Sequence, residues 1–152
     1  MANATTIQQF LASPNSYTII NVGGEISEVD LAKLCAALKV NTTLTTLHLV
    51  NNQIGDAGAA AIAEELKGNN TTLTTLSLYH NQIGNAGAKL LAEVLKTNNS
   101  LTSLNLEYNQ IKDAISNQII NDILEINKII AASNAYDTAS SEQRTTMILS
   151  AG

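Results

Sequence analysis

The chain has 152 residues, with 8 Lys and Arg residues against 13 Asp and Glu residues, a formal net charge of −5. This length predicts one domain, residues 1–152, and the acidic balance argues against nucleic acid and anionic membranes as partners, because no basic stripe is available to displace counterions. The first ten residues have neither a basic start nor an apolar run, and no stretch approaches the ~20 apolar residues of a membrane-spanning helix. We therefore expect a cytoplasmic protein without a signal peptide or a membrane segment.

A short helix is predicted near the N-terminus. Within Thr5–Gln9, each of two threonines is followed three residues later by a glutamine, which is the capping-box arrangement. The helix should end near Ala12, because Pro14 disfavours its continuation. Its apolar residues are Ile7, Phe10 and Leu11. We interpret residues 1–15 as a helical cap over the open end of the core.

The central part of the chain repeats itself. Three segments of the form Leu-x-x-Leu-x-Leu-x-x-Asn begin at Leu44, Leu73 and Leu101, a period of 28 to 29 residues. The alternating leucines have the period of a strand with one buried face, and the stretch that follows has the period of a helix. Repeats of this length are typical of solenoids, in which like units stack and bury a continuous core.

The predicted fold is therefore an α/β solenoid of about four repeats with helical caps. We expect a right-handed coil with short parallel β-strands on the concave face and α-helices on the convex face. Asn52, Asn81 and Asn109 fall where the chain leaves each strand, and we expect their amides to satisfy backbone groups there. The predicted units are a degenerate first repeat (16–43), regular repeats (44–72 and 73–100), a last repeat with an extended apolar helix (101–130) and a C-terminal cap or tail (131–152).

The repeat motif can be compared with a known family. The pattern LxxLxLxxNxI, followed by a Gly-Ala-containing helix start, resembles the ribonuclease-inhibitor type of leucine-rich repeat over residues 44–111. The resemblance implies a non-catalytic module that binds another protein. The vertebrate inhibitor is rich in cysteine and aromatic residues, whereas this chain has 1 Cys and 3% aromatic residues, so we do not expect nuclease inhibition.

Two further functions are implied by resemblance. The asparagine- and isoleucine-rich repeats are similar to those of bacteria living inside eukaryotic cells, which implies a secreted effector delivered into a host cytosol without a cleaved signal peptide. GTPase-activating proteins of the nucleus-transport type also use this repeat, and such activation often relies on a positioned arginine. The only arginine is Arg144, in the tail, and no catalytic set, phosphate loop or metal spacing appears. We therefore predict no enzyme activity, no cofactor and no metal.

The first repeat and the last helix depart from the regular pattern. An offset of 28 aligns Ile19 with Leu47 and puts Thr18, Ile20 and Val22 on the concave face. In the last helix we interpret a run of isoleucines as the main buried stripe and Ile120 with Leu124 as a second flank that needs a cover. The isoleucines of that run are Ile115, Ile119, Ile123, Ile126 and Ile130.

The tail is the candidate cover for this flank. Ser140 and Ser141 suggest a helix start, and Met147, Ile148 and Leu149 supply apolar groups. Folding back as a cap, pairing with a second chain, and serving as a recognition or export signal all stay open at this stage.

Small residues on the helices carry further expectations. Gly58 and Gly87 lie at helix starts, where we expect a close approach to the neighbouring coil, because glycine otherwise costs about 1 kcal/mol there. The single cysteine, Cys35, aligns with Ala63 and Ala92. We interpret it as a small buried side chain rather than a reactive thiol.

The outward strand positions form the predicted partner-binding face. Those of the regular and last repeats, with the residues just after each strand, are Thr46, His48, Val50, Thr75, Ser77, Tyr79, His80, Ser103, Asn105, Glu107 and Tyr108. Tyrosine is enriched in interface hot spots, so we place the centre at Tyr79, His80, Glu107 and Tyr108, although ordinary solvated strand residues would show the same pattern. His48 and His80 fall in different columns, which disfavours a metal pair.

Two binding hypotheses follow from this face. The strands offer fewer residues than the roughly 20 to 30 of a standard interface, so a partner must also contact the neighbouring loops or the helical flank, or two copies must combine. The leading hypothesis is a module that binds a partner protein. The alternative is a structural homo-oligomer that uses the last helix and the tail, and we expect a monomer or a weak homodimer.

Overall fold

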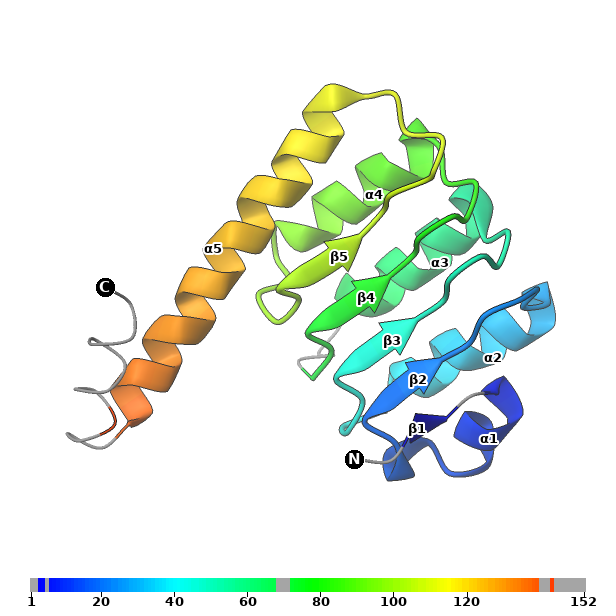
Figure 1. Ribbon diagram of the computed structural model, residues 1–152, viewed down its shortest axis with the longest axis horizontal. Helices are drawn as coiled ribbons and strands as arrows, with labels where there is room; N and C mark the ends of the chain where they lie inside the picture. The colour runs from blue at the N-terminus through cyan, green and yellow to red at the C-terminus, as the bar shows by residue number, and fades with distance from the viewer. Residues whose placement is uncertain (1–2, 5, 68–71, 140–142, 144–152) are drawn as a thin grey trace.

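The computed structural model describes residues 3–4, 6–67, 72–139 and 143. Strands and helices alternate along the chain, and the strands form one parallel sheet in sequence order, with α2 to α5 packed behind it (Figure 1). The strands are β1 (Asn3–Ala4), β2 (Ile19–Asn21), β3 (Thr46–His48), β4 (Thr75–Ser77) and β5 (Ser103–Asn105). The helices are α1 (Ile7–Ala12), the 3-10 turn η1 (Pro14–Ser16), α2 (Glu28–Leu38), α3 (Gly55–Lys67), α4 (Asn85–Leu95) and α5 (Ala114–Thr138). The predicted fold class is confirmed.

The N-terminal helix begins as the sequence predicts, at a capping box. The Thr6 hydroxyl accepts from the Gln9 N–H, and the Gln9 side chain accepts from the Thr6 N–H. Ile7 and Phe10 are buried in the core. The strand before this helix, β1, pairs in parallel with β2 and was not predicted, since two residues are too few to show a period.

The leucines of successive repeats align across the sheet. Leu47 pairs with Leu76, and Leu76 with Leu104, so the inward side chains form continuous columns. Leu47 and Leu76 are 0% exposed. Each repeat thus buries its strand leucines against its own helix and against its neighbours, which is how a chain of this size acquires a core.

The register predicted for the first repeat is wrong by one residue. Ile20, not Ile19, pairs with Leu47, and both Ile20 and Val22 are buried. Because side chains alternate along a strand, a slip of one residue moves the whole set to the other face. Ile20 and Val22 therefore belong to the core and not to the concave surface. The first repeat has one residue fewer between its strand and its helix than the regular repeats have. The offset of 28 that aligns the helices therefore misaligns the strands by one residue.

The asparagines after the strands form a ladder, as predicted. Asn81 is 0% exposed, its Oδ1 accepts from the N–H groups of Asn52 and Ile54, and its Nδ2 donates to the carbonyls of Leu49 and Tyr79. Asn52 and Asn109 make equivalent bonds in their own repeats. Each side chain therefore joins two adjacent turns.

A second asparagine ladder, which the sequence analysis missed, closes the turns before the strands. Asn98 Nδ2 donates to the carbonyl of Leu66, and its Oδ1 accepts from the Leu101 N–H. Asn41 Oδ1 accepts from the Leu44 N–H in the same way, at 2.7 Å. Asn127 Nδ2 donates to the carbonyls of Asn98 and Leu101. Asn41 and Asn98 stand in the loops before β3 and β5, whereas Asn127 belongs to α5.

The glycines at the helix starts allow adjacent coils to pack closely, as expected. A Cβ on Gly87 would lie 2.7 Å from Asp56 Oδ1 and 3.0 Å from the Cβ of Ala59, both in the preceding repeat. Asp56 Oδ1 accepts from the Gly84 and Gly87 N–H groups, so it caps the helix of the next repeat. The missing side chain is what permits this contact.

Helix α5 packs mainly through the flank that was predicted to need a cover, and of the predicted main stripe Ile119 and Ile123 pack partly against the core. Ile120 and Leu124 are 3% and 6% exposed, with Ser116 and Asn127 buried along the same line. By contrast Ile115 is 71% exposed. Ile126, Ile129 and Ile130 are also exposed. The second flank is therefore the main packed face, because Ile120 stands where α3 and α4 have Ala63 and Ala92, and Leu124 stands where α4 is followed by Lys96.

Two remaining expectations concern Cys35 and the tail. Cys35 is buried, as predicted, and burial raises the pKa of its thiol to about 11. The expected helix start at Ser140 and Ser141 and the apolar residues Met147, Ile148 and Leu149 lie outside the described residues. Within the described part of the chain, no helix is long and apolar enough to cross a membrane.

Candidate protein-binding face

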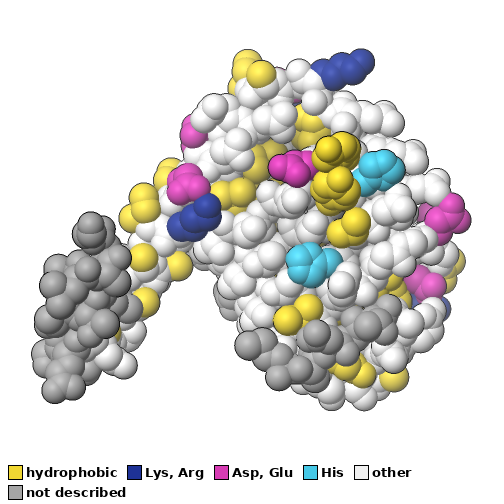
Figure 2. Space-filling model, viewed as in Figure 1, with side chains coloured by type: hydrophobic (Ala, Val, Ile, Leu, Met, Phe, Trp, Pro, Cys, Tyr) yellow, Lys and Arg dark blue, Asp and Glu magenta, His cyan; other side chains and the backbone are white. Residues whose placement is uncertain are grey.

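The outward side chains of β2 to β5 lie on the face of the sheet away from the helices. In the space-filling view, hydrophobic side chains gather between two histidines over this face, with an acidic side chain beside them (Figure 2). The chain has 2 histidines, so these are His48 and His80. The predicted residues therefore lie on one continuous surface.

Tyr79, His80 and Tyr108 form the aromatic centre of this surface. The ring centroids of Tyr79 and Tyr108 are 4.9 Å apart, with the planes tilted by 48°. The His80 ring lies 6.3 Å from Tyr79, and its Nδ1 is 2.9 Å from Asn51 Oδ1. Tyr108 is 72% exposed despite this contact. A large aromatic surface is thus held in place and presented to solvent.

The column formed by Asn51, His80 and Tyr108 has an unusual backbone. All three residues have positive φ, of 59°, 55° and 57°, because the chain turns sharply after each strand. Asparagine and histidine tolerate this conformation better than most residues, whereas a tyrosine is uncommon there. The turn therefore does not explain why Tyr108 is a tyrosine.

The other predicted residues contribute unequally. Ser77 is 8% exposed and offers little surface, while Thr46, His48, Val50, Thr75 and Asn105 are partly buried. Ser103 and Glu107 are exposed. Glu107 is the one predicted residue with a formal charge at pH 7, so this face is weakly acidic.

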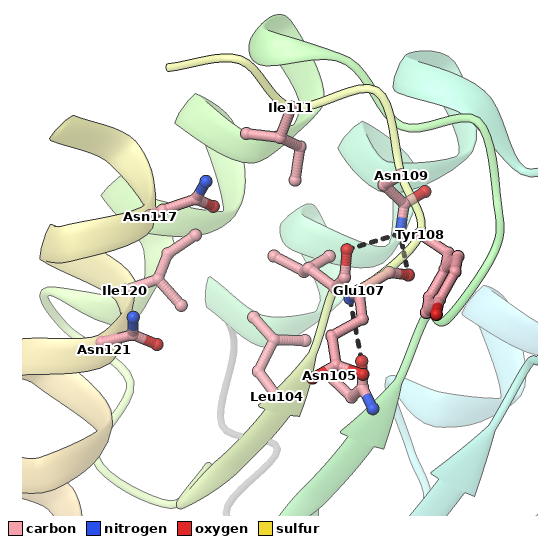
Figure 3. Close-up of a pocket in the computed structure, with 10 residues that line it drawn as sticks. Leu104, Asn105, Glu107, Tyr108, Asn109, Ile111, Asn117, Ile120 and Asn121 are labelled. Carbon is pink, nitrogen blue, oxygen red and sulfur yellow. Dashed lines mark hydrogen bonds between the residues drawn. The ribbon is translucent and has the colours of Figure 1, made fainter. Parts of the chain in front are cut away.

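A groove at the end of the sheet adjoins the aromatic centre. It has a volume of about 600 Å³ and lies between β5 with its following turn and the start of α5 (Figure 3). Its walls include Leu104, Leu106, Ile111 and Ile120, and Glu107 and Tyr108 form its rim on the sheet side. The sequence analysis did not anticipate this groove, which arises because no described repeat stacks on β5.

The chemistry of the face is that of a contact surface. Among the described residues no group of three or more His, Cys, Asp or Glu side chains could hold a metal ion. Its polar groups are hydroxyls, amides, imidazoles and one carboxylate, arranged around two tyrosines.

Comparison with known proteins identifies the repeat. Residues 40–63, 69–92 and 97–115 match the family model described as Leucine Rich repeat. The fold is a leucine-rich-repeat solenoid. No curated protein sequence matches the chain at a significant level.

Solved structures share this solenoid fold. The leiomodin-1 structure called Actin-Binding Site 2 has a TM-score of 0.67 and 23% sequence identity, covering 92% of this chain and 95% of the other. The tropomodulin C-terminal domain from structural genomics of Caenorhabditis elegans has a TM-score of 0.57 and 13% identity, covering 87% and 96%. At these identities the likeness concerns the fold.

Proposed function

We propose that this solenoid is a non-catalytic module that binds a partner protein through its strand face and the adjoining loops. The observation that carries the proposal is the ring contact between the exposed Tyr108 and the partly buried Tyr79, beside His80. Tyrosines of this kind supply large contact area at a low cost in side-chain entropy and are enriched among hot spots.

The backbone at Tyr108 supports the same proposal. A non-glycine residue in the left-handed region costs roughly 1 kcal/mol or more, and the two regular repeats have Asn51 and His80 at the equivalent position. A tyrosine held there at such a cost is accounted for by a contact outside the chain.

The partner chemistry follows from the surface. The face bears Glu107 and no basic residue among the predicted set, and the whole chain has a formal net charge of −5, so a neutral or basic protein surface is the compatible partner. Because leiomodin-1 is named for an actin-binding site, monomeric actin is the first protein to test.

Calorimetric titration with monomeric actin tests both the face and this partner. We expect Tyr108→Asn and Tyr79→Ala to weaken binding by about 2 kcal/mol, roughly 30-fold. Asparagine suits the backbone at position 108, so the first variant should keep its fold. Leu90→Ala on α4, where the side chain is 44% exposed, is the control and should bind normally.

The titration has two outcomes that would contradict part of the proposal. Actin binding that is unchanged by both tyrosine variants would contradict the proposed face. If actin does not bind at all, it is removed as a partner, and the same variants then apply to any candidate with a basic surface.

A second candidate function is self-assembly, and a specific observation favours it. Ile126, Ile129 and Ile130 are 54%, 68% and 39% exposed on the half of α5 that projects beyond the sheet (Figure 1). Such a row of exposed isoleucines is a surface that a second copy could cover. Solution mass, treated below, separates the two functions.

We also propose, from the repeat sequence alone, that the repeats are of the ribonuclease-inhibitor type and that the module acts as an effector in a host cytosol. A translocation reporter fused to the chain tests the second point. Reporter signal in host cells that depends on a bacterial secretion system would support it, and signal confined to the bacterium would contradict it.

A further inference from the structure

The outer edge of β5 has the hydrogen-bonding pattern of a strand that pairs on both sides. In the earlier repeats the Leu49 N–H donates to the Ser77 carbonyl, and the Leu78 N–H donates to the Asn105 carbonyl. The equivalent donor after β5 is the Leu106 N–H, for which the described part of the chain provides no acceptor. This edge can therefore pair with one more parallel strand.

The Tyr108 N–H continues a second row of such bonds. The Asn51 N–H donates to the Tyr79 carbonyl, and the His80 N–H donates to the Glu107 carbonyl. The Tyr108 N–H is next in this row, and no described group accepts from it. Its φ of 57° matches the 55° of His80, so the chain turns in the same way at both residues.

The asparagine ladder supplies a third row, in which the acceptor is a side chain. The Asn52 N–H donates to Asn81 Oδ1 at 2.9 Å, and the Asn81 N–H donates to Asn109 Oδ1 at 3.0 Å. The Asn109 N–H comes next and has no acceptor among residues 3–4, 6–67, 72–139 and 143. Because its equivalents bind a carboxamide oxygen, the same group fits here.

A backbone acceptor at the start of β5 completes the set. The carbonyls of Thr18, Thr45 and Thr74 each accept from two N–H groups and a threonine hydroxyl of the next repeat. The Thr102 carbonyl is next in this row, and nothing in the described chain donates to it. From Thr102 to Asn109 the edge thus offers an acceptor and then three donors, which is the order that a parallel strand of this repeat meets.

The apolar side chains beside this edge are incompletely covered. Leu104 and Leu106 are partly buried, whereas their equivalents Leu76 and Leu78 are 0% exposed. With Ile120 of α5, they form the apolar wall of the groove at the end of the solenoid (Figure 3). A strand that enters this groove needs apolar residues at alternate positions, since alternate side chains point to the same face.

The charge of the groove selects among such strands. Glu107 is the charged residue among those that line it, and Asn117 and Asn121 on its α5 side are neutral. In the register that joins β4 to β5, the residue beside Glu107 lies two positions before the asparagine of the added strand. A lysine or arginine at this position forms a favourable cross-strand pair, whereas an acidic residue is repelled.

We propose that the β5 edge binds an extended segment of a partner protein as a further parallel strand. The segment has two apolar residues at alternate positions, a basic residue directly after the second, and an asparagine two residues later. Its backbone carbonyls accept from the Leu106 and Tyr108 N–H groups, and its asparagine Oδ1 accepts from the Asn109 N–H. This inference rests on the proposed function and deepens it, because it states which part of the partner docks beside the strand face.

Head-to-tail stacking of a second copy does not supply this strand. At the other end of the solenoid β1 already pairs with β2, and Ile7 and Phe10 of α1 are buried in the core. The two ends of the molecule are therefore not complementary, and the segment comes from a separate partner.

NMR titration of the isotope-labelled full chain with a synthetic peptide tests the site. The peptide has the sequence of residues 73–83 with Tyr79→Lys, because this segment meets the equivalent groups of β3 within the molecule. We expect the amide signals of Leu106, Tyr108 and Asn109 to shift and to saturate below about 1 mM peptide.

Matched peptides and protein variants show whether binding occurs at this edge. In the peptide, Asn81→Leu should weaken binding by about tenfold, and Tyr79→Glu in place of Tyr79→Lys by about fivefold. In the protein, Asn121→Trp places a large side chain at the groove from an exposed site on α5 and should weaken binding by about tenfold. Asn134→Trp, at an exposed site further along α5, is the matched control and should keep the parent affinity.

Two results of the titration would overturn the proposal. One is the absence of saturating shifts at the three amides, and the other is equal affinity for the peptides with and without the asparagine. The titration with actin reports on the strand face and the peptide titration on the groove, so the two proposals can fail separately.

Amide hydrogen exchange of the peptide-free protein is an independent measurement. We expect fast exchange at Leu106, Tyr108 and Asn109, and slow exchange at Leu78, whose N–H is bonded to the Asn105 carbonyl. Slow exchange at the first three amides would overturn the proposal, because they would then already be bonded. A rate that falls with protein concentration would assign the edge to a second copy.

Discussion

Asparagine side chains bond the turns of neighbouring repeats on both sides of the strands. Each carboxamide donates and accepts, so one buried side chain satisfies several backbone groups that the sheet and the helices leave without partners. Asn81 makes four such bonds and is 0% exposed. The stability of the stack therefore depends on single polar residues as well as on the leucines.

Replacing Asn81 should be costly. Asn81→Ala leaves buried N–H and carbonyl groups unpaired, at about 1–3 kcal/mol for each group that water does not reach, so we expect the free energy of unfolding to fall by about 3 kcal/mol. Urea unfolding measures this change. Asn99→Ala, at an exposed site, should stay within about 0.5 kcal/mol of the parent. Similar losses for the two variants would contradict the ladder's role.

Cys35 should make stability depend on alkaline pH. Burial, with the nearby negative charge of Glu65, raises the pKa of the thiol from 9.0 to about 11. The unfolded chain therefore loses this proton at lower pH than the folded chain. The contribution is fully present below pH 9 and is lost as the pH rises toward 11, by up to about 2.5 kcal/mol.

Cys35→Ala is the matched variant for this prediction, since Ala63 and Ala92 occupy the equivalent sites. Lysines and tyrosines titrate in both proteins, so the difference between the two curves isolates the thiol. Urea unfolding at intervals from pH 8 to 11 should show the parent losing stability faster. Parallel curves would contradict the prediction.

Helix α5 differs from the other helices in length and in the face that it buries. It has 25 residues, against 11 in α4, and begins where Asp113 Oδ1 accepts from the Ile115 N–H. The hydrogen bond from Ser116, followed by that from the Ile115 N–H, lowers the pKa of Asp113. Its first half closes the core through Ile120, and its second half projects into solvent. One helix therefore combines a packing segment with an exposed one.

Substitutions on the two faces of α5 should have very different effects. Ile120→Ala removes a side chain that is 3% exposed, and we expect a loss of about 2–4 kcal/mol in the free energy of unfolding. Ile115→Ala changes a side chain that is 71% exposed and should cost less than about 0.5 kcal/mol. Thermal or urea unfolding of the pair measures the difference. The reverse order would restore the face predicted from sequence.

For the whole molecule, the decisive features lie at its ends. Interior repeats cover one another, but a terminal repeat needs a cap or a partner. At one end, β1 and α1 cover the first repeat. At the other, the β5 edge and the isoleucines of α5 remain exposed in the described part of the chain. If the protein associates with itself, we therefore expect the contact to form at this end of the solenoid.

Light scattering after size exclusion, across a tenfold range of concentration, measures whether the protein self-associates. The exposed isoleucines favour weak self-association, so the average mass should rise above 16.1 kDa with concentration. Ile129→Lys should hold the mass at 16.1 kDa. Val29→Lys, at an exposed site on α2, should behave like the parent. A constant monomer mass in the parent would eliminate the self-assembly function.

The sequence by itself determined the repeat, the alternation of strand and helix, the first asparagine ladder and the capping box at Thr6. These features are local, because a period of two or of three to four residues reports the face that a segment buries. The composition of the strand face could also be listed in advance, since the leucine pattern fixes which residues of the regular repeats point outward.

Only the tertiary structure decided the register of β2, the pairing of β1, the buried face of α5 and the groove beside β5. Each depends on how one repeat lies against its neighbour, and a difference of one residue in loop length or a helix rotation leaves little trace in a local pattern. The ring contact of Tyr79 with Tyr108 has the same origin, because it joins residues in adjacent repeats that only strand pairing brings together.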